Sequence, residues 1–89
     1  MSFEEILENY RNQIDTIDFE IIYLLSRRFQ IVEEIGNIKK AEWIDAYQPD
    51  RWNVLREKLL EEADDKGVNK ELIENIWDLI HKESLHRES

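Results

Sequence analysis

Cysteine is absent from this chain of 89 residues, which has only one Pro and two Gly. Without cysteine, neither disulfide bonds nor thiolate zinc sites can form. Strand-rich folds need many tight turns, so a chain with few turn-forming residues favours a small number of long helices. No apolar run approaches the length of a membrane span and the N-terminus has no secretory signal pattern, so we expect a soluble, cytoplasmic protein.

The chain is acidic, because 21 Asp and Glu outnumber 12 Lys and Arg and give a formal net charge of −9. Nucleic acids and anionic membrane surfaces are therefore poor partners. An anionic small molecule is also repelled at long range, so a site for one requires a local cluster of Arg and Lys. With 42% hydrophobic residues the chain is too apolar to be disordered, and its length fits a single domain over residues 1–89.

Apolar residues recur at helical spacing through residues 3–40, which predicts one very long first helix. It begins with a capping-box pattern at Ser2 and Glu5, and only Gly36 weakens it, by about 1 kcal/mol relative to Ala. Such a helix is about 57 Å long, whereas a compact chain of this size has a radius of gyration of about 12 Å. Its apolar stripe must therefore be covered, and a second copy of the chain is the simplest cover.

Two shorter helices are predicted after a loop over residues 42–48. Pro49 suits the first turn of the second helix, Gly67 is its expected left-handed stop, and Asn69 is a good N-cap for the third helix. The predicted fold is all-α, a three-helix protomer with a very long first helix that wraps around its twin as a two-fold homodimer. The apolar stripes of the two shorter helices, predicted to form core, are Trp52, Leu55, Leu59, Leu60 and Ala63, then Leu72, Ile73, Ile76, Trp77, Ile80 and Leu85.

Basic residues near the apolar side of the helices are the candidate binding groups. Four residues share one face of the first helix, with two cations bracketing an apolar floor: Arg28, Val32, Ile35 and Lys39. Arg11 falls near the same side, and Arg51 opens the second helix beside Trp52. These cations either snorkel and pair with the abundant carboxylates, or they hold an anionic ligand. A buried, unpaired cation is costly and Arg grips a carboxylate at two points, so the cluster favours an anionic ligand.

Other chemistry has little support in the sequence. His81 and His86 stand five apart with only Glu83 and Glu88 nearby, which is poor spacing for a metal site. Neither Ser26 nor Ser84 has a His–Asp pattern around it, and there is no glycine-rich phosphate loop. We therefore expect no metal and no cofactor. An enzyme without these groups can still act by shape and charge.

Together these residues resemble the AroQ class of chorismate mutases over nearly the whole chain. An Arg, an Arg-Arg pair, a Gly-x-x-Lys and an x-x-Arg at these separations are specific in combination, although each is weak alone. The segments that carry the resemblance are Leu7-Glu8-Asn9-Tyr10-Arg11, Ile14-Asp15, Ile17-Asp18, Leu24-Leu25-Ser26-Arg27-Arg28, Ile35-Gly36-Asn37-Ile38-Lys39, Pro49-Asp50-Arg51 and Ile80-His81-Lys82-Glu83-Ser84. The resemblance implies an intertwined, all-helical homodimer with two identical sites. It also implies the [3,3] rearrangement of chorismate to prephenate, on the path to Phe and Tyr.

The resemblance also implies roles for individual residues. Arg28 and Arg51 would bind the substrate's carboxylates, and Arg11 would reach into the partner's site to grip a carboxylate there. Lys39 and Glu88 would face the ether oxygen whose bond breaks. The remaining positions would complete the pocket, with a polar edge and an apolar wall: Ser84, Val32 and Ile35.

Three positions depart from the family's commonest pattern. Positions 48, 52 and 88 are commonly Asp, Glu and Gln, and here they are Gln48, Trp52 and Glu88. Gln48 is the candidate for holding the ring hydroxyl. Trp52 is expected to line the substrate site without making that contact. Glu88 can donate a hydrogen bond only when protonated, which predicts activity that improves toward acidic pH.

Three alternative functions remain open. The first is an enzyme that eliminates pyruvate from isochorismate, which shares the fold and the cations and lacks acids at positions 48 and 52. The second is a non-catalytic helical dimer that binds a ligand or regulates a pathway enzyme. The third is a plain helical interaction protein whose cations are all surface pairs. Substrate assays, ligand titration and replacement of Arg28 or Lys39 by Ala separate them.

Overall fold

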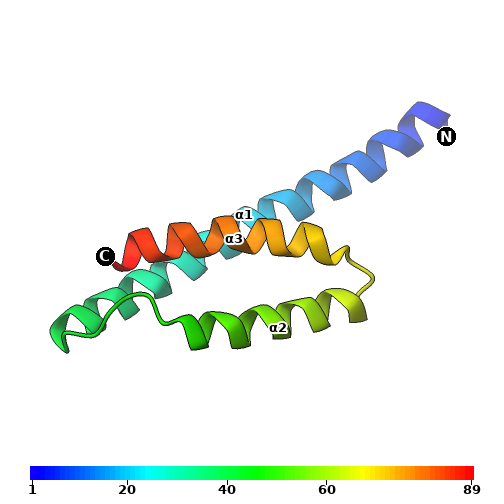
Figure 1. The fold of residues 1–89 in the computed structure, drawn as a ribbon. Helices are drawn as coiled ribbons and strands as arrows, with labels where there is room; N and C mark the ends of the chain where they lie inside the picture. Colours follow the sequence, from blue (N-terminus) through cyan, green and yellow to red (C-terminus); the bar gives the residue numbers. More distant parts are fainter. The chain divides into compact units, whose positions relative to one another are not determined.

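A computed structural model describes all residues from 1 to 89 and consists of three α-helices without strands. They are α1 (Phe3–Ala41), α2 (Pro49–Asp65) and α3 (Lys70–Glu88), as Figure 1 shows. The predicted all-α class, the very long first helix and the loop after it are confirmed, with α1 ending one residue later than expected. None of the helices is long and apolar enough to cross a membrane.

The helix ends form where the sequence predicts them. The backbone N–H of Glu5 donates to Ser2 Oγ at 3.1 Å, and that of Leu72 donates to Asn69 Oδ1 at 2.9 Å. Pro49 occupies the first turn of α2, where its missing N–H costs nothing. Gly67 has a φ of 70°, the left-handed conformation that glycine adopts without a steric penalty.

Lys66 closes α2 with two carboxylates. Its Nζ donates to Glu62 Oε1 at 2.8 Å and to Asp65 Oδ2 at 3.0 Å. The hydrogen bond to Glu62, followed by that to Asp65, raises the pKa of Lys66 above its ordinary value. All three side chains are exposed, so these pairs are screened by solvent and contribute little to stability.

The chain divides into two compact units, residues 1–31 and residues 32–89. The first unit is helical throughout after its first two residues, and a single helix cannot bury a stripe against itself. The apolar stripe of residues 1–31 is therefore uncovered in the single chain, and the expectation that a second copy of the chain covers it stays a prediction. Residues more than half exposed there include Tyr10, Ile14, Ile17, Ile21 and Leu24.

The second unit has its core between the antiparallel helices α2 and α3, which lie side by side (Figure 1). Its buried apolar residues are Val32, Ala63 and Ile80. The predicted stripe of α2 is confirmed, since its residues are all buried or half-buried. The predicted stripe of α3 is only partly core, because Leu72 and Ile76 are exposed. These two side chains point away from the single face that α3 shares with its neighbours in this unit.

Candidate active site

The close approach of two helix backbones at Gly36 brings the candidate site together. A Cβ atom on Gly36 would lie only 2.7 Å from Glu88 Cα and 2.8 Å from Glu88 O. Gly36 is buried, and no residue with a side chain fits there without moving α3. The glycine that weakens α1 in the sequence is therefore the residue that lets the last turn of α3 lie against α1.

Lys39 stands one turn further along α1 and is held by two acceptors from different parts of the chain. Its Nζ donates to Glu88 Oε1 at 2.7 Å and to the carbonyl of Ala46 at 3.1 Å. The two side chains are largely shielded, with 18% of Lys39 and 11% of Glu88 exposed. An ammonium group has three hydrogens to donate, so one remains for a ligand. The two fixed bonds orient that third hydrogen in advance.

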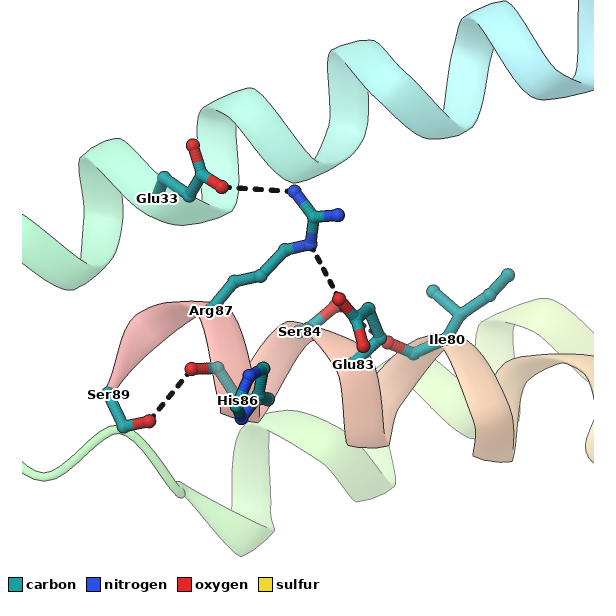
Figure 2. Close-up of polar contacts among 7 residues, drawn as sticks. All are labelled: Glu33, Ile80, Glu83, Ser84, His86, Arg87 and Ser89. Atoms are coloured by element: carbon teal, nitrogen blue, oxygen red, sulfur yellow. Dashed lines mark hydrogen bonds and ion pairs between the residues drawn. The ribbon is translucent and has the colours of Figure 1, made fainter.

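The residue expected at the pocket edge, Ser84, and those expected in its apolar wall, Val32 and Ile35, differ in their exposure to solvent. Ser84 is buried, and its Oγ donates to the carbonyl of Ile80 at 2.8 Å (Figure 2). Val32 is buried, whereas Ile35 is 40% exposed and offers an apolar surface beside Lys39 along α1. The structure thus brings Lys39, Glu88 and Val32 into one unit with Ser84.

Residues at the start of α2 surround an open hollow. Gln48 and Arg51 are both exposed and line it with the loop that precedes them; the other lining residues are Ile44, Asp45, Tyr47, Pro49 and Asp50. The expectation that Arg51 lies toward the core is therefore wrong for the single chain. Its guanidinium reaches solvent because position 51 falls outside the apolar stripe of α2 that starts at Trp52.

Trp52 stacks on His81 of α3, with ring centroids 4.1 Å apart and planes 11° apart. Tyr47 adds a tilted contact to the same imidazole at 6.0 Å. The indole therefore links α2 to α3, and a role in lining the substrate site stays a prediction. Sequence reasoning missed this stack, because nothing in the spacing of residues 52 and 81 pairs them.

Arg87 is the second feature that the sequence did not reveal. Its Nε donates to Glu83 Oε1 at 2.8 Å and its Nη1 donates to Glu33 Oε1 at 3.0 Å, as Figure 2 shows. The hydrogen bond to Glu83 is the largest cause of a raised pKa for Arg87, and the bond to Glu33 adds to it. Together they outweigh the opposing effect of burial. The i, i+4 spacing to Glu83 was a signal in the sequence, whereas the contact with α1 was not.

The other two candidate cations, Arg11 and Arg28, belong to residues 1–31. Arg11 is exposed and Arg28 is half-buried. Arg28 therefore has the partial shielding expected for a binding cation, whereas Arg11 in the single chain points to solvent.

The chain is all-helical and holds a shielded lysine between a carboxylate and a carbonyl, and comparison with known proteins gives its family. The family Chorismate mutase type II matches residues 10–89. The chain belongs to this family.

Several characterised proteins are similar to the chain. The T-protein of Haemophilus influenzae is 32% identical over 89 residues, which is 100% of this chain and 24% of that protein. The bifunctional chorismate mutase/prephenate dehydratase of Aquifex aeolicus is 33% identical over 73 residues, 82% of this chain and 18% of that protein. The 4-amino-4-deoxychorismate mutase of Streptomyces venezuelae is 23% identical over 80 residues, 90% of this chain and 78% of that protein. The chain thus spans about a quarter or less of the length of the first two.

Proposed function

We propose that the chain is a chorismate mutase, an isomerase that rearranges chorismate to prephenate in the biosynthesis of Phe and Tyr, without a cofactor. The observation that carries this proposal is Lys39, an ammonium group held by Ala46 and Glu88 with one hydrogen left to donate. The test is loss of chorismate absorbance with purified protein, followed by identification of prephenate. The cytoplasmic location expected from the sequence stays a prediction.

The chemistry of the reaction matches this arrangement. The rearrangement is concerted and unimolecular, so it needs no acid, base or nucleophile. The breaking C–O bond puts negative charge on the ether oxygen, and Lys39 stabilises that charge more in the transition state than in the ground state. Arg28 and Arg51 bind the two carboxylates, which holds the flexible side chain of the substrate over its ring in advance. Val32 and Ile35 form the apolar wall, Ser84 the polar edge, and Gln48 holds the ring hydroxyl beside Trp52.

Glu88 faces the same ether oxygen. Its carboxylate accepts from Lys39 Nζ, and its negative charge lies next to the charge that develops on the substrate. A glutamine at this position can still accept from Lys39, can donate to the ether oxygen and carries no charge. We therefore expect Glu88→Gln to turn over chorismate at least about tenfold faster than the parent. Rates of chorismate loss for the two proteins check this, and equal rates would show that Glu88 does not face the reacting oxygen.

A second copy of the chain supplies the missing cation of each site. Most of the apolar residues of the first helical unit are more than half exposed in the single chain, and a two-fold partner covers such a stripe. In this intertwined homodimer, Arg11 of each protomer reaches into the partner's site and grips a carboxylate.

Mixing two inactive variants tests this shared site. Arg11→Ala and Lys39→Ala are each expected to be nearly inactive, while a refolded equal mixture recovers about one quarter of the parent activity. Half of the randomly paired dimers are mixed, and each of these has one intact site made from the two good residues. Sedimentation of the mixture gives the dimer fraction. No recovery in a dimeric mixture would place Arg11 and Lys39 in the same chain's site, or Arg11 in none.

A different substrate is the second candidate. Gln48 and Trp52 replace the commoner acids at the positions next to the ring hydroxyl, and the Streptomyces relative that acts on an amino analogue is covered over most of its length. Parallel assays with chorismate, isochorismate and 4-amino-4-deoxychorismate rank these substrates. Tight binding of a bicyclic transition-state mimic without any turnover would instead favour the non-catalytic, ligand-binding dimer.

A further inference from the structure

Arg87 connects the last turn of α3 to α1 through carboxylates on both helices. Its Nε binds Glu83 on its own helix at 2.8 Å and its Nη1 binds Glu33 on α1 at 3.0 Å (Figure 2). Glu33 lies just before Gly36 in α1, and Arg87 directly precedes Glu88. The bridge therefore spans the two helices next to the point where their backbones come closest.

The last turn of α3 has little else to hold it. The last carbonyl groups of a helix have no N–H donor within that helix, so its final turn frays easily. Here the carbonyl of His86 accepts from Ser89 Oγ at 2.8 Å, which is a contact within the same turn. Contact with Gly36 sets how close the turn can come and supplies no polar bond to α1. Two polar bonds join this turn directly to α1, that of Arg87 to Glu33 and that of Lys39 to Glu88.

We propose that Arg87 is a positioning residue for the rearrangement, because its bridge between Glu33 and Glu83 keeps the last turn of α3 against Gly36 and so keeps Glu88 beside Lys39. This inference rests on the proposed function. The planar guanidinium donates in two directions at once, along α3 to Glu83 and across to Glu33. A lysine at this position binds one carboxylate well and the other poorly.

The expected effect is local and moderate. Arg87 is 38% exposed and Glu33 is 50% exposed, so solvent screens the pair and global stability depends little on it. The local population of the docked turn is more sensitive, because few other bonds hold it. We expect a change of about fivefold, the upper range for an exposed pair.

Arg56 provides a matched control. It forms an ion pair with Glu74 between α2 and α3, with similar exposure of 44% and 34%. Glu74 stands fourteen residues before Glu88 on the same helix, which is roughly 21 Å along its axis. Losing this pair removes one inter-helix arginine–glutamate bond without touching the last turn.

The experiment combines amide hydrogen exchange with the kinetics of chorismate turnover. Arg87→Gln is expected to raise exchange at residues 85–88 by about fivefold and to lower kcat for chorismate by a similar factor, with KM unchanged because Arg28 and Arg51 still bind the substrate. Arg87→Lys recovers part of both effects. In a Glu88→Ala background, Arg87→Gln causes no further loss of kcat, and Arg56→Gln alters neither quantity.

The outcomes separate this inference from the proposed function. Unchanged exchange at residues 85–88 in Arg87→Gln would overturn the bridge. Faster exchange with unchanged kcat, or a loss of kcat that persists without Glu88, would overturn its action through Glu88. If the parent protein does not turn over chorismate, the proposed function and the catalytic consequence fail together, while the exchange result still decides whether Arg87 holds the turn.

Discussion

Lys39→Ala is expected to lower kcat for chorismate by about two to three orders of magnitude, equivalent to ~3–4 kcal/mol of transition-state stabilisation. The ammonium group is oriented before the substrate arrives, because Ala46 and Glu88 take two of its three hydrogens. The variant loses that donor and also leaves the shielded carboxylate of Glu88 beside the developing negative charge. The measurement is kcat and KM for chorismate, with circular dichroism to show that the helices remain.

The neighbouring Lys40 is the matched control for Lys39. It stands on the same last turn of α1, is exposed, and has the same charge and helix propensity. Lys40→Ala removes one positive charge from the chain and leaves the site intact, so its kcat should stay within about twofold of the parent. Equal losses in the two variants would mean that Lys39 acts only through the general charge of the helix end.

Gly36→Ala is expected to destabilise the protein by about 1–3 kcal/mol, the usual cost of forcing atoms into a packed contact. An exposed glycine within a helix would give the opposite result, a gain of about 1 kcal/mol. The reason for the reversal is the 2.7 Å distance from the added Cβ to the backbone of Glu88, which cannot rotate away as a side chain would. The last turn of α3 must move, and kcat should fall by at least about tenfold because Glu88 no longer orients Lys39.

Urea unfolding and kcat of the same preparation test the Gly36 prediction. Asn37→Ala is its control, because Asn37 is the next residue of α1, is exposed and lies in a helix interior. Ala is the better helix former there, so a small increase in stability with unchanged activity is expected. A gain in stability for both variants would mean that α3 does not approach α1 at this point.

Local signals in the sequence were sufficient to locate the helices. Ser2, Pro49, Gly67 and Asn69 each act on backbone groups within four residues, so their effect is readable without knowledge of the tertiary structure. The glycine at position 36 was noticed for its cost to the helix. Its structural role depends on contact with a helix about fifty residues later in the chain, and no local sequence pattern predicts that contact.

Burial was less predictable than helix position. The stripe of α2 is confirmed as core, yet the equally regular stripe of the first helical unit is exposed in the single chain. Periodicity shows which side of a helix is apolar and does not show what covers it. The same reason explains why Leu72 and Ile76 are exposed although they lie among the buried residues of α3.

The candidate site was predicted in part. Lys39 and Glu88 were expected at one atom of the substrate, and their side chains meet at 2.7 Å. The positions of Arg87 and His81 were not anticipated, since each depends on a partner from another helix that no spacing rule identifies.

The order in which the contacts of residues 32–89 form follows from their separation along the chain. Arg56 and Glu74 are 18 residues apart, whereas Lys39 and Glu88 are 49 apart and Glu33 and Arg87 are 54 apart. Closing the longer loops costs about 1 kcal/mol more of chain entropy. We therefore expect the α2–α3 hairpin to assemble early and the end of α1 to dock on it last. The groups proposed for catalysis would then lie at the helix contact that closes last during folding.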